Sequence, residues 1–349
     1  MSPQRIDRGL ATLSPAYFGM VMATGIVSLA AAAHGFEPLA QALFVLNIGF
    51  YVLLWVLYLA RLVRCTSAFF RDLFDHLTGP AFFTVVAGTS VLGAQFLQLA
   101  GDLRVAAVLW ALALVLWLLL TYAIFTILTV KEDKPPLDRG ISGGWLLAVV
   151  ATQSLAVLSA LLAARIGQPW KLELNFFALS MWLWGGMLYI WMMSLIFYRY
   201  TFFRFQPSDL SPPYWINMGA MAISTLAGSL LIINSPDAPF LQSVKPFLKG
   251  FTIFYWATGT WWIPMLLVLG VWRHIYKRFP LRYDPLYWGA VFPLGMYTAC
   301  TDAMAKALEL SFLAPITVWF LAVALAAWAG TVLGALMRVA SVLRKPATP

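Results

Sequence analysis

The chain has 349 residues, of which 62% are hydrophobic and only 11% are charged, whereas soluble domains carry roughly 25% charged residues. With a mean hydropathy of +0.81, this composition excludes a soluble globular protein, and the length allows about ten membrane helices of about 20 residues each. The net charge of +9 would suit a nucleic-acid partner if it formed a patch, so its distribution along the chain decides its meaning.

Apolar runs bounded by charges, glycine or proline predict ten transmembrane helices in a single domain, 1–349. A β-barrel would need short strands of alternating polarity, whereas 106–130 is continuously apolar apart from threonines and a tyrosine. The fold class predicted is therefore all-α integral membrane. In chain order, the expected spans are 14–33, 39–62, 78–99, 103–130, 141–164, 171–198, 212–233, 245–271, 285–308 and 312–337.

The basic residues are strongly one-sided with respect to these spans. Because the number of spans is even, one side of the membrane holds both termini and every loop that follows an even-numbered helix. That side carries 17 of the 23 lysines and arginines, so the positive-inside rule places both termini in the cytoplasm of a cell (inner) membrane. This topology explains the positive charge without nucleic acid. The residues are Arg5, Arg8, Arg61, Arg64, Arg71, Lys131, Lys134, Arg139, Arg199, Arg204, Arg273, Lys277, Arg278, Arg282, Arg338, Arg344 and Lys345.

The ten spans fall into two classes. Odd-numbered spans hold the helix breakers and small polar residues, and helix kinks are expected at Pro15, Pro80, Pro213 and Pro293. Even-numbered spans are rich in Leu and aromatic residues, and 12 of the 16 tryptophans lie in or beside them, as expected for a lipid-facing surface. Freed carbonyls and hydroxyls are costly in lipid, so the odd helices should form an inner ring inside five helical hairpins.

Two odd spans begin with similar short sequences, a similarity that we call the echo. Pro213-Tyr214-Trp215 opens the seventh and Pro285-Leu286-Tyr287-Trp288 opens the ninth. The echo is compatible with a repeated hairpin, although Tyr-Trp pairs also serve as simple anchors at the membrane interface.

Few residues in the spans could carry chemistry. Asp302 and Lys306 lie four apart on the ninth span and so share a helix face. They form either a purely structural ion pair or a functional site, in which Lys306 attracts anions or Asp302 moves protons. His34, His76 and His274 are scattered, and the spans lack paired catalytic groups, so we expect no metal, no cofactor and no enzyme activity. Phe292 precedes Pro293, but composition alone does not separate it from a packing residue.

The chain resembles the tellurite-resistance and dicarboxylate transporter family, which includes plant slow anion channels and fungal malate and sulfite transporters. The resemblance runs along the whole chain and is carried by 15–25 (PAYFGMVMATG), 212–220 (PPYWINMGA) and 288–295 (WGAVFPLG). It implies ten helices in five hairpins, odd helices around a central pore, and three protomers with a pore each. It also implies that Phe292 is the aromatic gate.

This resemblance, together with the polar residues of the odd spans, suggests a mechanism. Small anions such as malate or an inorganic ion would pass an uncharged or mildly positive pore. Its wall candidates are Thr24, Thr84, Asn217, Ser224 and Thr298, although each can instead bond a carbonyl one turn back. Two further readings stay open: a proton-coupled carrier for dicarboxylate or sulfite, and a scaffold or sensor without a wet path. Apart from the anion and lipid, the expected partner is a second and third copy of the chain.

Overall fold

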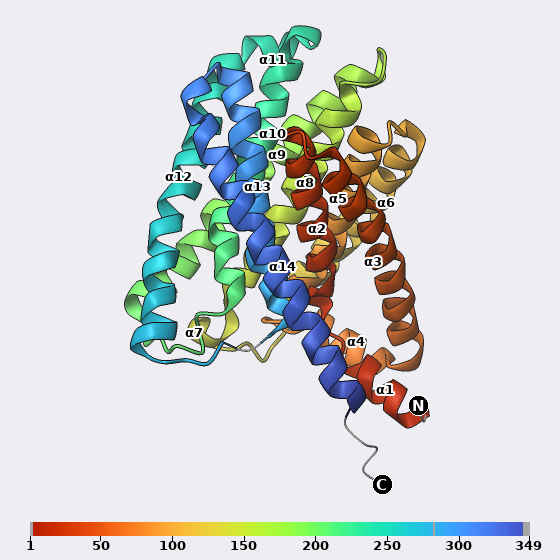
Figure 1. The fold of residues 1–349 in the computed structure, drawn as a ribbon, viewed down its shortest axis with the longest axis vertical. Coiled ribbons are helices and arrows are strands. Elements are labelled where there is room, and N and C mark those ends of the chain that lie inside the picture. Colours follow the sequence, from red (N-terminus) through yellow and green to blue (C-terminus); the bar gives the residue numbers. More distant parts are fainter. Residues whose placement is uncertain (1–2, 282, 345–349) are drawn as a thin grey trace.

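The computed structural model describes residues 3–281 and 283–344, which form an all-α bundle without a strand (Figure 1). Nine helices in these ranges are long and apolar enough to cross a membrane, so the chain is a multi-pass membrane protein. The short helices α7 (Leu137–Gly140) and α11 (Pro239–Ser243) lie in connections at opposite ends of the bundle (Figure 1).

The nine candidate spans are one fewer than the ten predicted. The span expected at 285–308 does form a helix, α13 (Trp288–Leu308), but it is not among the nine. Its apolar residues are interrupted by Pro293, by glycines and by the charges of Asp302 and Lys306. Its neighbours compensate for this weak hydropathy, because α13 packs against helices on several sides.

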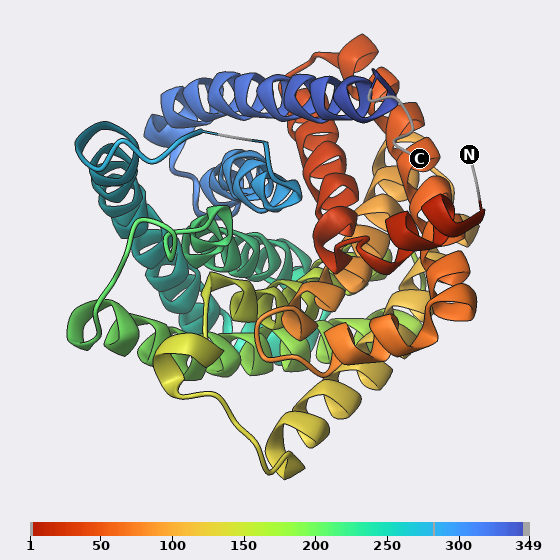
Figure 2. The same cartoon turned by 90° about the horizontal axis from the view of Figure 1, so that it is seen from below.

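Five helices form a closed inner ring. They are α2 (Gly19–Ala33), α5 (Phe83–Leu99), α8 (Leu147–Ala163), α10 (Ile216–Asn234) and α13. Each contacts the next, and α13 returns to α2 (Figure 2).

Each inner helix is covered by the long helix that follows it in the chain. These outer helices are α3 (Glu37–Arg64), α6 (Leu103–Val130), α9 (Trp170–Phe202), α12 (Lys245–Val271) and α14 (Ala314–Arg344). The candidate spans built on α2, α5, α8 and α10 are 72–94% buried, against 22–44% for the outer ones. The outer helices therefore shield the inner ring and present much of their own apolar surface outward.

Tryptophans of the outer helices do more than face lipid. Four indole N–H groups point inward and donate to hydroxyls on the inner ring, at distances of 2.7–3.0 Å. The pairs are Trp110 with Ser159, Trp117 with Thr152, Trp256 with Thr301, and Trp328 with Thr24. Four of the polar residues of the inner helices thus bond the two rings to each other, because an indole N–H in an apolar bundle needs an acceptor.

A buried arginine holds the lower end of the bundle in Figure 1, where α1 (Pro3–Ala11) and α4 (Thr66–Leu73) lie. The side chain of Arg61, in α3, is fully buried. Its Nη2 donates to the carbonyls of Ala11 and Ala68 and to Asp72 Oδ2, the last at 2.5 Å. One guanidinium therefore joins α1, α3 and α4 next to the connection that leads to α5.

Candidate functional site

Each inner helix begins with a 3₁₀ turn, and the five turns form a second closed ring. They are η1 (Pro15–Phe18), η2 (Gly79–Phe82), η3 (Gly143–Leu146), η4 (Pro212–Trp215) and η7 (Pro285–Tyr287). Each turn contacts the next, and η7 contacts η1. The echo between the seventh and ninth spans is thus part of a fivefold structural repeat, which the sequence showed only in its two most similar members.

The prolines of these turns start helices. Pro15, Pro80 and Pro213 lie in η1, η2 and η4, where a missing backbone N–H is not needed by the helix. The prediction that they kink membrane helices is wrong. Pro293 does lie inside a helix, α13, and the outer helix α12 contains a second internal proline, Pro264, that was not singled out.

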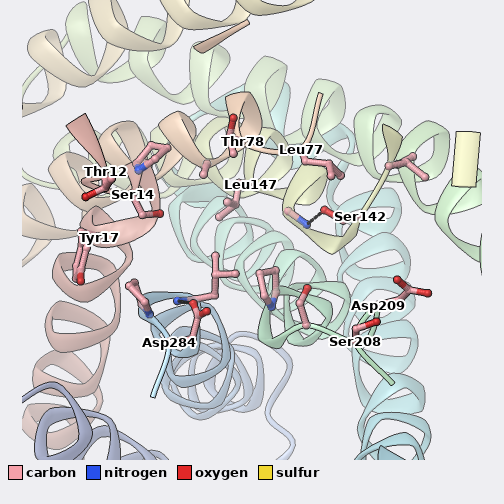
Figure 3. Close-up of a pocket in the computed structure, with 18 of the residues that line it drawn as sticks. Thr12, Ser14, Tyr17, Leu77, Thr78, Ser142, Leu147, Ser208, Asp209 and Asp284 are labelled. Atoms are coloured by element: carbon pink, nitrogen blue, oxygen red, sulfur yellow. Dashed lines mark hydrogen bonds between the residues drawn. The ribbon is translucent and has the colours of Figure 1, made fainter. Parts of the chain in front are cut away.

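The residue before each turn is small and polar: Ser14, Thr78, Ser142, Ser211 and Asp284. Three of them cap their turns through the side chain. The hydroxyls of Ser14 and Ser142 each accept from a backbone N–H at 3.3 Å, and Asp284 Oδ1 accepts from Leu286 N at 2.8 Å. Thr78 and Ser211 hold the same position without such a bond, and we call all five the capping residues by their position. All five line one cavity of about 840 Å³ at this end of the ring (Figure 3). We call it the inner cavity.

The inner cavity carries charges of both signs at its rim. Arg199 is engaged, because its Nε donates to the carbonyl of Asp138, Nη1 donates to the Tyr214 hydroxyl, and Nη2 lies 3.7 Å from Asp209 Oδ1. Arg139 and Arg338 are exposed and form no ion pair among the residues that the structure describes.

The connection before η2 is held by a neighbouring carboxylate, Asp75. Its Oδ1 accepts from the backbone N–H groups of Leu77 and Thr78 at 2.9 Å and from the Thr78 hydroxyl. Burial alone would raise the pKa of Asp75, but these hydrogen bonds lower it below its ordinary value. The ionised carboxylate therefore orders the segment that supplies Thr78 to the ring.

A second cavity, of about 250 Å³, lies within the same inner ring and is lined by all five inner helices. We call it the outer cavity, because it lies towards the opposite end of these helices from the inner cavity. Its wall is mostly apolar, and the exceptions are Ser90, Gln98, Ser154 and the Asp302–Lys306 pair. Lys306 Nζ lies 2.7 Å from Asp302 Oδ2, with the Lys306 side chain 65% exposed and that of Asp302 25% exposed. Asp302 and Lys306 thus form the predicted ion pair, and both residues line the outer cavity.

In each of the five repeats, the residues that line the two cavities are separated by the same number of positions. Twelve positions after each capping residue stands a residue that lines the outer cavity: Ile26, Ser90, Ser154, Ile223 and Met296. Four positions earlier, about one α-helical turn closer to the inner cavity, stand Met22, Val86, Val150, Gly219 and Phe292.

These last five residues form what we call the barrier layer. All of them are buried, and neither cavity reaches them. On α8 the two cavities are separated by the seven positions from Leu147 to Ser154, or about 10 Å. Phe292 is the largest side chain of the layer and is wholly inaccessible, and its equivalent on the neighbouring α10 is a glycine.

The five polar wall candidates line neither cavity. Thr84, Ser224 and Thr298 donate to carbonyls three or four residues back, and Thr84 also donates to the Pro15 carbonyl. Thr24 accepts from Trp328 of α14, and Asn217 donates to Tyr200 of α9. Each of the five side chains thus has at least one partner outside the two cavities, although Asn217 Oδ1 is buried without one among the described residues.

Ser90 and Ser154 are the hydroxyls that do line the outer cavity, and polarity alone did not separate them from the others. Ser154 donates to the Ala151 carbonyl, whereas the buried Ser90 hydroxyl has no partner among the described residues. Counting from the capping residues would have found both, because they occupy the twelfth position of their repeats.

A ring of membrane helices with two opposed cavities and a closed layer between them defines a membrane transport protein. The sequence model described as SLAC1, voltage-dependent anion channel, matches residues 12–336, so the chain belongs to this family. The resemblance seen in the sequence is confirmed. The chain is thus an anion channel or transporter, and not an enzyme.

Several relatives carry names without an assigned substrate. An uncharacterized membrane protein of Mycobacterium tuberculosis is 37% identical over 156 residues, covering 45% of this chain and 79% of the relative. Two uncharacterized transporters of Methanocaldococcus jannaschii are each 24% identical, over 308 and 299 residues. These alignments cover 86% and 83% of this chain, and 85% and 84% of the relatives.

Proposed function

We propose that anions cross the membrane along the axis of the inner ring and that Phe292 plugs this path. The proposal includes ten membrane helices arranged as five hairpins, with α13 as the ninth. The observation that carries it is the barrier layer: two cavities on one ring of helices are separated by a single buried layer in which Phe292 is the bulkiest side chain. The transported species are a C4-dicarboxylate such as malate or a small inorganic anion.

The electrostatics of the ring favour anions. Five inner helices begin at the inner cavity, and each helix N-terminus carries about half a positive charge. The outer cavity offers hydroxyls, an amide and one lysine that is balanced by Asp302. Weak, distributed polar contacts of this kind allow an anion to enter and also to leave.

We also propose that the inner cavity opens to the cytoplasm of a cell with an inner membrane. The segment after α1 and the last turns of α14 both border this cavity, through Thr12 and Arg338. The excess of basic residues on this side supports the orientation, although Arg282 and Lys345 lie outside the described residues. A homotrimer with one path in each protomer is proposed from the family resemblance.

The test compares two phenylalanine variants in proteoliposomes. Phe292→Ala should raise the flux of chloride, nitrate, sulfite or malate by about tenfold or more, which corresponds to lowering a barrier by about 1.4 kcal/mol. Phe83→Ala is the matched control, because Phe83 is just as buried but packs against Phe125 of the outer helix α6, with ring centroids 6.2 Å apart. Unchanged flux in a folded Phe292→Ala protein would contradict the assignment of Phe292 as the gate.

A proton-coupled carrier is the alternative, and one observation favours it: Asp302 is the carboxylate that lines the outer cavity. A coupled carrier would show saturable malate or sulfite movement that follows an imposed proton gradient. Asp302→Asn should then abolish the dependence on the gradient while Lys306 remains charged. Coupling that persists in Asp302→Asn, or flux that ignores the gradient in the wild type, would favour the channel.

A further inference from the structure

The capping ring contains one charged member. The five capping residues occupy equivalent positions, and four of them are hydroxyls: Ser14, Thr78, Ser142 and Ser211. The fifth, Asp284, is a carboxylate in the same place. All five line the inner cavity, where an anion would approach the barrier layer. A negative charge in this ring works against the five helix N-termini that surround it.

Capping does not require this charge. Asp284 Oδ1 accepts one hydrogen bond, from Leu286 N at 2.8 Å, and the side chain is exposed. The serine hydroxyls at the equivalent positions 14 and 142 accept the same type of bond, and serine and aspartate are about equally good helix caps. A hydroxyl at 284 would therefore still cap the turn, at the loss of the modest stabilisation that the carboxylate gains from the helix dipole.

The other charged groups at the inner cavity lie outside the ring. Asp138 and Arg139 belong to α7, Arg338 belongs to α14, and Arg199 and Asp209 face each other. Asp284 forms no ion pair in the part of the chain that the structure describes. Its carboxylate is the charge set directly at the start of an inner helix, α13, which also carries Phe292.

We propose that Asp284 is a charge filter at the inner mouth, which selects monovalent anions over divalent ones. This inference rests on the proposed function. The repulsion between Asp284 and an anion is proportional to the charge of the anion, so the local concentration of a dianion falls by the square of the factor for a monoanion. A threefold depletion of chloride implies a roughly ninefold depletion of a dianion, and the filter thus sets specificity without touching the barrier layer.

The experiment measures initial anion flux in proteoliposomes, below half-saturation, for the wild type and in the Phe292→Ala background. Asp284→Ser, which makes the ring entirely hydroxyl, should raise chloride flux about threefold and flux of malate, a dianion at neutral pH, about ninefold. Asp284→Asn should do the same. The reciprocal variant Ser211→Asp adds a second carboxylate at an equivalent position. It should lower chloride flux about threefold and malate flux about ninefold.

Ionic strength separates an electrostatic effect from a structural one. An impermeant salt at about 1 M shortens the screening length to about 3 Å. The factors by which Asp284→Ser raises chloride and malate flux over the wild type should then both fall towards one. Thermal unfolding and size-exclusion profiles establish that each variant is folded.

Two outcomes overturn the inference: equal factors for chloride and malate, or no change in folded Asp284→Ser and Ser211→Asp proteins. Absence of anion flux in both the wild type and Phe292→Ala would instead contradict the proposed function itself. The two failures are therefore distinguishable in one set of vesicles.

Discussion

The contact between α10 and α13 at the barrier layer can be tested with a single methyl group. A Cβ atom on Gly219 would lie 2.6 Å from Cγ and 3.0 Å from Cβ of Pro293, whereas ordinary contacts begin at 3.4 Å. The proline ring is rigid and Phe292 precedes it, so Gly219→Ala must push the two helices apart by nearly 1 Å (3.4 − 2.6 Å). Overpacking of this kind costs about 1–3 kcal/mol.

The chain offers a control that isolates this cost. Gly250 lies in the outer helix α12 with nothing within 4 Å of the position of an added Cβ. Both substitutions gain the same helix preference of alanine over glycine, about 1 kcal/mol. Gly250→Ala should therefore be neutral or stabilising, and Gly219→Ala should be less stable than Gly250→Ala by about 1–3 kcal/mol.

Unfolding in detergent and anion flux in vesicles are the two assays. Because the helices separate beside Phe292, Gly219→Ala should also increase the leak of anions, while Gly250→Ala should leave it unchanged. Equal stability and equal flux for the two alanine variants would refute the tight α10–α13 contact and the barrier layer built on it.

Two further predictions concern the hydrogen bonds that hold the bundle together. Trp117→Phe removes the indole that donates to Thr152 at 2.8 Å. It should destabilise the protein by at least about 0.6 kcal/mol, the typical contribution of such a bond, because the smaller ring also leaves a cavity at this buried site, and flux should change little. A similar loss in Trp191→Phe, at an exposed site, would count against the bond between the rings. Arg61→Met removes the buried partner of Asp72, which keeps only the exposed Arg71, with its Nε 3.5 Å from Asp72 Oδ1, and should cost at most about 3–5 kcal/mol in unfolding experiments. Adding Asp72→Asn should recover part of that loss, and no recovery would mean that the ion pair is not what Arg61 contributes.

Much of the architecture could be predicted because membrane helices follow from composition. Long apolar runs leave helices as the sensible way to satisfy the backbone in lipid, and a helix occupies most of each predicted range. The two classes of helix were also visible, since small residues permit the close approach seen between Gly219 and Pro293. The inner helix that is not among the nine candidate spans, α13, is the one that holds Phe292 and the Asp302–Lys306 pair.

The candidate site was harder to predict. Polar residues identify the helices of the inner ring, but they do not show which side of each helix lines a cavity. Thr24 and Ser90 are both small hydroxyls on inner helices, yet Thr24 accepts from Trp328 and Ser90 lines the outer cavity. Pro15 and Pro293 are both prolines of predicted inner spans, yet one starts a helix and the other lies inside one.

The sequence by itself determined that this chain is helical and embedded in the membrane, and it determined which helices are small and polar enough to occupy the centre. These properties depend on the transfer of side chains and backbone from water to lipid, which local composition describes well. Only the tertiary structure decided that five 3₁₀ turns close into a ring and that Met22, Val86, Val150, Gly219 and Phe292 hold equivalent buried positions that line neither cavity. Ring closure depends on contacts between residues far apart in the chain, such as Gly19 and Trp288, and such contacts leave no local pattern in the chain.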